Sequence, residues 1–319
     1  MIGHHKYASA WAKAVKEHLY QRNLHKRPLH IISANMHSVK NVLYGAGTMK
    51  ERGDSVPASL YDVVPALLDK DAEVLTFAQQ YGFSFLLDLS GSNIDVMVID
   101  VTEIKGDLLH ADLSVDFDYI QKEKPVIVVM DYAFGTQAYE IMDELLCPCP
   151  YEEGTLTFQI ESISIMGKAG ILPGKKGDIM LATAHVMEGT PHNYIVVNDL
   201  RVEDFEGKAD VYVGPMVTVL GTSLQNRDVL ERFYISSWKA VGLEMEGGHY
   251  QRAINAAVIQ KHISTKVRVR YAYYASDNPL FGGQTLAAGS MGAQGIAPTY
   301  LITKVLLQKI LNPPIERRR

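Results

Sequence analysis

Cysteine, long apolar runs and excess positive charge are all scarce in this sequence of 319 residues. The two cysteines, Cys147 and Cys149, are separated only by Pro148 and have no second pair, so the spacing of a zinc site is missing. No apolar run approaches the roughly 18 residues of a membrane helix, and residues 1–19 lack the pattern of a signal peptide. The formal net charge of -5 argues against a broad nucleic-acid surface. We therefore predict a cytoplasmic protein with two reduced thiols, no metal and no cofactor.

Hydrophobic residues, in contrast, make up 47% of the chain, enough for a sizeable core. Segments with strand-like and helix-like spacing alternate. We expect strands over Leu29–Ala34, Asp95–Val101, Val126–Met130, Ser162–Met166, Ile179–Ala182 and Val267–Ala275, and helices over Tyr7–Arg22, Gln137–Leu146, Gly247–Lys261 and Tyr300–Leu311, with another from Ser38. The stretch Tyr44–Pro57, with three glycines and a proline, is expected to be a loop. This order predicts an α/β fold with a mixed, mostly parallel central sheet flanked by helices.

Five segments rich in polar residues and glycine follow predicted strands. Ligands collect at the carboxyl ends of strands in such sheets, so we expect these segments to meet. They are Ser33–Ser38, Asp131–Thr136, Met166–Gly170 with Lys175–Asp178, Glu244–Gly248, and Ser276–Pro279.

Several of these segments resemble the nucleoside phosphorylase/nucleosidase superfamily. Gly167–Leu172, followed by Gly177-Asp178-Ile179, resembles its glycine-rich turn and Gly-Asp-Ile strand. Leu243–Glu246 is similar to its Glu-Met-Glu ribose-binding motif, and Ala275–Asp277 to its Ser-Asp catalytic motif. Within the superfamily, the closest resemblance is to AMP nucleosidases. The resemblance implies a three-layer sandwich with a catalytic domain over 27–319 after a helical extension over 1–26.

The resemblance also implies roles for individual residues. Asp277 would be the acid that protonates the leaving base if burial raises its pKa, and Glu246 would grip the ribose hydroxyls. Met245 would pack against the sugar. Further substrate contacts would come from Glu244, Gly135, Gly167, Lys168, Ser276 and Thr222. The expected partners are a purine nucleoside or nucleotide, phosphate and further copies of the chain, because superfamily members commonly form oligomers.

Two departures from the superfamily pattern leave the nucleophile open. The arginine that phosphorylases carry before the glycine-rich turn is replaced by Ile165, which disfavours phosphate as nucleophile. The first turn has no carboxylate to position a water, and His37 is the best replacement there. Lys168 suits a phosphate group or is simply a surface lysine. We therefore predict hydrolysis of a purine N-glycosidic bond, as in AMP nucleosidases. The alternatives are a phosphate-dependent phosphorylase and a non-catalytic nucleotide-binding protein.

Overall fold

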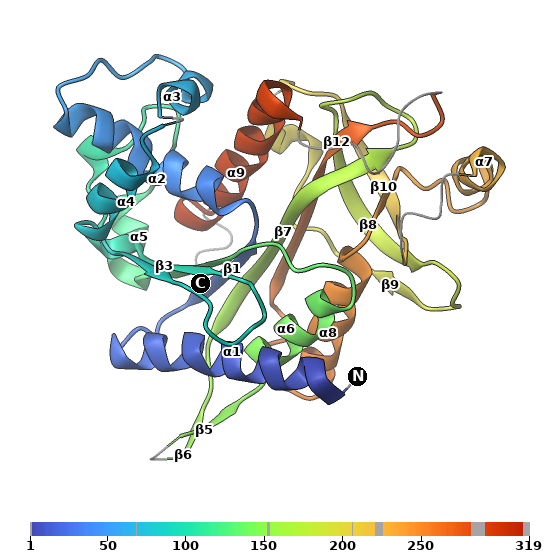
Figure 1. Ribbon diagram of the computed structural model, residues 1–319, viewed down its shortest axis with the longest axis horizontal. Helices are drawn as coiled ribbons and strands as arrows, with labels where there is room; N and C mark the ends of the chain where they lie inside the picture. Colours follow the sequence, from blue (N-terminus) through green and yellow to red (C-terminus); the bar gives the residue numbers. More distant parts are fainter. Residues whose placement is uncertain are drawn as a thin grey trace.

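The computed structural model describes residues 2–67, 69–151, 154–205, 207–220, 226–281 and 291–314. Figure 1 shows helices arranged around a long twisted sheet. The helices are α1 (Ile2–Gln21), α2 (Met36–Glu51), α3 (Leu60–Ala66), α4 (Asp71–Gln79), α5 (Phe117–Glu123), α6 (Gln137–Leu146), α7 (Arg227–Ile235), α8 (Gly247–Ile259) and α9 (Ile296–Leu311). The strands are β1 (Leu29–Ser33), β2 (Phe83–Leu86), β3 (Val96–Asp100), β4 (Val126–Met130), β5 (Cys149–Tyr151), β6 (Gly154–Leu156), β7 (Ile160–Ile171), β8 (Ile179–Met187), β9 (Asn193–Ile195), β10 (Val211–Thr218), β11 (Gly242–Glu244) and β12 (Arg268–Asp277).

The main sheet has ten strands in the order β11-β10-β8-β12-β7-β1-β4-β3-β2, with β9 beside β8. Because β11 also pairs with β7, the five strands β7, β12, β8, β10 and β11 close into a ring. Among the described strands, the parallel pairings in this sheet are β1–β4, β1–β7, β10–β11, β8–β10 and β7–β12. The antiparallel ones, β7–β11, β8–β12, β2–β3, β3–β4 and β8–β9, are as numerous. The sheet is mixed, as expected, but it is not clearly mostly parallel. Antiparallel pairings occur within the ring, at β7–β11 and β8–β12, and where β2, β3 and β9 are added to the sheet.

Alternate residues of the central strands feed two separate cores. In β4, Val126 and Val128 pack into a core with α1, α6 and α8, whereas Ile127 and Val129 pack into a second core with α2, α4 and α9. A strand covered on both faces must be apolar at every position, which explains the unbroken run in β4. The helix expected as an N-terminal extension, α1, contributes Trp11 to the first core, and the Trp11 indole donates to the Ile94 carbonyl at 2.7 Å.

The loop prediction for Tyr44–Pro57 is wrong in its first half, because α2 continues to Glu51. The loop was predicted because each glycine destabilises a helix interior by about 1 kcal/mol relative to alanine. Here Gly45 and Gly47 are needed for close packing, since a Cβ at Gly47 would lie 2.5 Å from the Phe77 ring.

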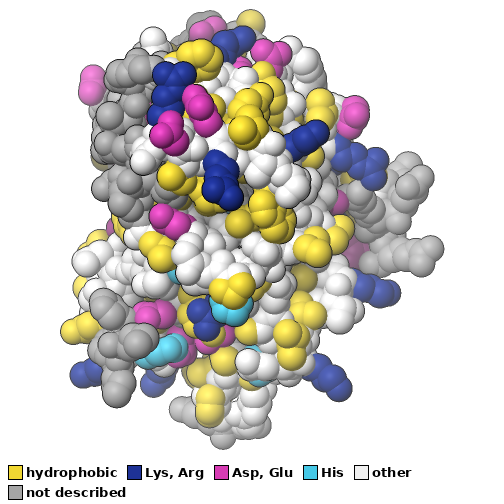
Figure 2. Space-filling view, turned by 90° about the vertical axis from the view of Figure 1, so that its right-hand side faces the viewer, with side chains coloured by type: hydrophobic (Ala, Val, Ile, Leu, Met, Phe, Trp, Pro, Cys, Tyr) yellow, Lys and Arg dark blue, Asp and Glu magenta, His cyan; other side chains and the backbone are white. Residues whose placement is uncertain are grey.

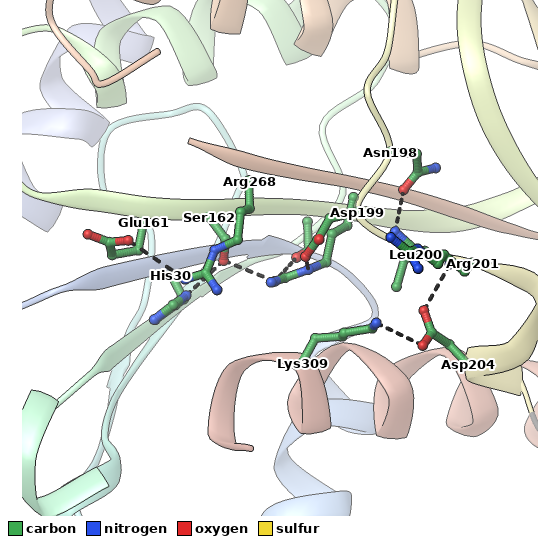
Figure 3. A network of polar contacts seen from close by, with 12 residues as sticks. His30, Glu161, Ser162, Asn198, Asp199, Leu200, Arg201, Asp204, Arg268 and Lys309 are labelled. Atoms are coloured by element: carbon green, nitrogen blue, oxygen red, sulfur yellow. Dashed lines mark hydrogen bonds and ion pairs between the residues drawn. The ribbon is translucent and has the colours of Figure 1, made fainter. Parts of the chain in front are cut away.

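A buried polar network ties together the early part of three neighbouring strands (Figure 3). The Arg270 guanidinium, on β12, donates to Asp199 and to the Ser162 hydroxyl, both at 3.0 Å, and His30 on β1 contacts the same hydroxyl at 2.7 Å. Because Arg270 is fully buried, its charge requires the Asp199 carboxylate. The network thus fixes the strand ends opposite to those that carry the predicted site.

The surface mixes polar and apolar side chains. On the face that carries α7 and β9, hydrophobic side chains lie scattered between charged ones (Figure 2), and Val197 and Ile235 are among the exposed residues of this region. Across the part of the chain described here, no helix has the length and apolarity needed to span a membrane. Both cysteines are free thiols. The expected cytoplasmic location and oligomer stay predictions.

Candidate functional site

Residues from each of the five predicted segments line one cavity of about 430 Å³ at the carboxyl ends of the strands. The Lys175–Asp178 part of the third segment does not, because it lines a separate surface hollow. Ser33 comes from the end of β1, Tyr132–Phe134 from the loop after β4, and Met166–Gly170 from β7. The turn between β11 and α8 contributes Leu243–Glu246, and the end of β12 contributes Ser276. The prediction that these segments meet is confirmed, because parallel strands of one sheet present their carboxyl ends at the same edge.

Glu244 anchors the turn that forms one wall of the cavity. Its carboxylate is buried and accepts hydrogen bonds from His185 Nδ1 at 3.2 Å, the Thr218 hydroxyl, the Glu246 N–H at 2.7 Å and the Gly247 N–H. The two backbone donors belong to the first turn of α8, whose N–H groups have no partner within the helix. Burial alone would raise the pKa of Glu244, but its hydrogen bonds and the charge of His185 lower that pKa below the usual value. The expected substrate contact, Glu244, is thus committed to protein donors.

The Gly247-Gly248 pair lets this turn approach its neighbours closely. A Cβ at Gly247 would lie 2.2 Å from His185 Cε1 and 2.4 Å from the Tyr273 hydroxyl. Any other residue would push α8 away from β8 and β12. The glycines therefore serve helix placement, which brings Glu246 to the cavity.

Glu246 faces the cavity at the start of α8 and accepts the Gly135 N–H at 3.2 Å. Burial, and then the negative charge of Glu244, raise the pKa of Glu246 to about 7. Glu246 is therefore a carboxyl group that gains or loses a proton near neutral pH. Met245 lies beside it in the cavity wall, and its contact with a sugar stays a prediction.

Asp277 is buried at the end of β12, next to Ser276, which lines the cavity. The Ser276 hydroxyl donates to Asp277 Oδ1 at 2.5 Å, and among the residues that the structure describes Asp277 Oδ2 has no hydrogen-bond partner. Burial raises the pKa of Asp277, although the bond from Ser276 and the charges of Lys168 and Lys176 act in the opposite direction. This raised pKa is the condition that the sequence analysis set for an acid.

The glycine-rich turn expected at Gly167–Gly170 does not exist, because β7 runs through it from Ile160 to Ile171. Gly170 pairs with Leu243 in β11 and with Asp277 in β12. The backbone at Lys168 is paired with β12 and does not form a turn that could hold a phosphate. The Lys168 side chain, however, lines both the cavity and an adjoining hollow of about 220 Å³.

His37 lies in the adjoining hollow and not in the main cavity. Its ring contacts the Asp71 carboxylate at 3.0 Å, and its side chain is 67% exposed. A water oriented by His37 would have to reach the sugar through the hollow that Lys168 also lines. Thr222 lies outside the described residues.

Sequence reasoning missed most of the aromatic lining. Tyr250, Tyr273, Tyr274 and Phe134 all contribute to the cavity. Within the described chain, the buried Tyr273 hydroxyl and His185 Nε2 have no hydrogen-bond partner. Inside strand and helix patterns the three tyrosines and His185 resemble ordinary core residues, and the unpaired polar atoms distinguish only Tyr273 and His185.

The sequence matches one family model, described as "Family of unknown function (DUF6909)", over residues 61–312. The chain belongs to this family. No curated protein sequence matches it. The solved structures similar to this DUF6909 chain include futalosine hydrolase of Helicobacter pylori, with 12% identity, a TM-score of 0.50 and coverage of 89% of this chain and 98% of that one. A putative methylthioadenosine nucleosidase from Weissella paramesenteroides has 13% identity and a TM-score of 0.50, covering 89% of this chain and 97% of that one. These likenesses confirm the predicted nucleosidase-type fold.

Replacing Glu246 with glutamine is expected to stabilise the protein at about pH 8 and to change little at about pH 4.5. The folded-state pKa of about 7 exceeds the ordinary value of 4.5. The stabilisation from this proton is therefore complete below pH 4.5 and is lost as the pH rises through about 7. The neutral amide avoids that loss, which for a pKa raised from 4.5 to about 7 is on the order of 3 kcal/mol.

Urea unfolding of Glu246→Gln at both pH values measures this difference. The matched control is Glu51→Gln, since Glu51 is exposed at the end of α2 and should behave as the wild type. An equal stability change at the two pH values would contradict the titration assigned to Glu246.

Proposed function

We propose that this protein hydrolyses the N-glycosidic bond of a purine nucleoside or nucleotide and releases the free base. The observation that carries the proposal is that one carboxyl group lines an aromatic cavity and a second, of different character, lies directly behind the cavity wall. Glu246 projects into it from the start of α8, and Asp277 lies behind Ser276 at the end of β12. Structures of the same fold include a futalosine hydrolase and a putative methylthioadenosine nucleosidase, which supports this reaction class.

The two carboxyl groups suit the two demands of the reaction. The leaving base needs a proton, and Asp277 has a raised pKa and an oxygen not bonded by the described residues. The ribose acquires positive charge as the bond breaks, and an ionised Glu246 at its hydroxyls stabilises that charge. Tyr273, Tyr274 and Phe134 supply apolar faces for the base or sugar.

The position of Lys168 favours a nucleotide as substrate. Its side chain lies between the cavity and the hollow that contains His37. If Lys168 binds the 5′-phosphate of the substrate, the nucleophile is water and not inorganic phosphate. His37 lines the same hollow as Lys168 and would orient that water. A single lysine, without the bidentate hydrogen bonds of an arginine, does not fix the orientation of inorganic phosphate well enough for it to act as the nucleophile. We therefore propose AMP-like nucleotides as the substrates and ribose 5-phosphate as the second product.

A panel of purine nucleosides and nucleotides, with and without added phosphate, tests the reaction. We expect free base to appear without phosphate, fastest from AMP, and Asp277→Asn to slow its release by about 10²- to 10⁴-fold because the base loses its proton donor. Base release that requires phosphate and yields ribose 1-phosphate would identify a phosphorylase. Ligand binding with no base released would identify a binding protein, and near-wild-type turnover of Asp277→Asn would exclude Asp277 as the acid.

The variant Lys168→Ala is expected to lower kcat/KM for AMP but not for adenosine. Loss of a charge-assisted hydrogen bond costs about 1.5–3 kcal/mol in kcat/KM for AMP, whereas adenosine, without phosphate, is little affected. Added phosphate should inhibit the wild type by competing for Lys168.

Lys176→Ala is the matched control, because Lys176 also acts on Asp277 but lines a different surface hollow. Equal losses for AMP and adenosine in Lys168→Ala, or the same selectivity loss in both variants, would refute a phosphate contact.

A further inference from the structure

The histidine beneath the ribose-binding turn has no assigned role. His185 lies on β8, one of the five strands of the ring, and is fully buried. A carboxylate only accepts hydrogen bonds, so His185 Nδ1 donates to Glu244 across 3.2 Å. We propose that His185 is a positioning residue that keeps Glu244 ionised beneath the turn and thereby fixes the orientation and charge of Glu246. This inference rests on the ribose-binding role proposed for Glu246.

The geometry explains how a residue that does not reach the cavity wall could control one that does. Glu244 Oε2 accepts the N–H groups of Glu246 and Gly247, so its acceptor capacity sets the path of the chain into α8. Its other oxygen, Oε1, accepts from His185 and from the Thr218 hydroxyl. Thr218 in turn accepts the Gly248 N–H at 3.0 Å, so the first turn of α8 is held by one acceptor system. A protonated Glu244 would give up part of this capacity.

A buried carboxylate needs a partner of opposite charge, because neutral donors alone repay desolvation poorly. Among the described residues, His185 is the basic side chain paired with Glu244. The tyrosines packed nearby, Tyr271 and Tyr273 from β12 and Tyr250 from α8, stay neutral since burial raises the pKa of each. The charge of Glu244 also raises the pKa of His249 on α8. Burial and the charge of Arg252 outweigh this effect, so the pKa of His249 lies below the usual value. This leaves His185 as the group that balances Glu244.

The charge of Glu246 depends on the same pair. Glu244 and Glu246 are two residues apart and repel each other when both are ionised. Without His185 the pKa of Glu244 would rise, and the pair would bind its first proton more tightly and closer to Glu244. A neutral Glu244 would repel Glu246 less and would accept fewer hydrogen bonds from the turn that places Glu246. An enzyme that needs the Glu244 carboxylate to hold the turn would then lose activity, as the pH falls, at a higher pH than the wild type does.

The test is a titration of the carboxylic-acid C=O infrared band in the full-length protein, with Glu246→Gln used to assign the band. We expect His185→Ala to move proton uptake by the Glu244–Glu246 pair to a pH about one unit higher or more. His185→Gln, which keeps a donor but no charge, should give a smaller upward shift. Thr218→Val, which removes a neutral donor from the same oxygen, should shift the titration less than His185→Ala.

The variants keep the proposal falsifiable. An unchanged titration in His185→Ala, or an equal shift in Thr218→Val, would overturn it. If His185→Ala does not fold, the titration of His185→Gln replaces it as the test. An infrared band that titrates at the wild-type pH in that variant would overturn the proposal. In an active wild type, the acid limb of kcat/KM should move upward in His185→Gln. A wild type that releases no base refutes the proposed function, but the infrared titration still tests the role of His185.

Discussion

The site depends on the satisfaction of one buried carboxylate. Glu244 ends β11, the short strand that closes the ring between β10 and β7, and its side chain holds the first N–H groups of α8. Gly242 and Leu243 close the ring on β7, and Glu244 directly after them places the helix, so ring closure and helix placement are set by three consecutive residues. Because buried acceptors are costly without donors, the four hydrogen bonds to Glu244 specify one arrangement of strand, turn and helix. The position of Glu246 at the cavity follows from that arrangement, because Glu246 lies in the turn that Glu244 holds.

This arrangement also separates the roles of two nearby acidic residues. Glu244 is surrounded by donors and has a lowered pKa, whereas burial and the charge of Glu244 raise the pKa of Glu246 to about 7 despite backbone hydrogen bonds from Gly135 and Met245. Behind Ser276, burial raises the pKa of Asp277. Acid–base chemistry at neutral pH needs groups whose environments separate their proton affinities in this way.

Much of the fold and the meeting of the five segments could be predicted from the sequence, because apolar runs mark strands and ligand groups follow strand ends. The ring closure could not, since β11 has three residues and its partners are distant in sequence. Gly45 and Gly47 suggested a loop, because close packing of α2 against its neighbours leaves no local signal. His185 was missed for a similar reason, since a histidine within a strand gives no sign of the carboxylate it will meet.

The central claim is that an ionised Glu246 stabilises positive charge on a bound ribose. Calorimetric titration with a purine nucleoside mimic, whose ribose ring oxygen is replaced by an amine that stays protonated throughout, tests it most directly. The account predicts binding at least about 100-fold tighter than that of the neutral nucleoside. It also predicts tighter binding at about pH 8 than at about pH 6, because Glu246 ionises between them. Binding no tighter than that of the nucleoside, or binding that weakens as the pH rises, would contradict the account.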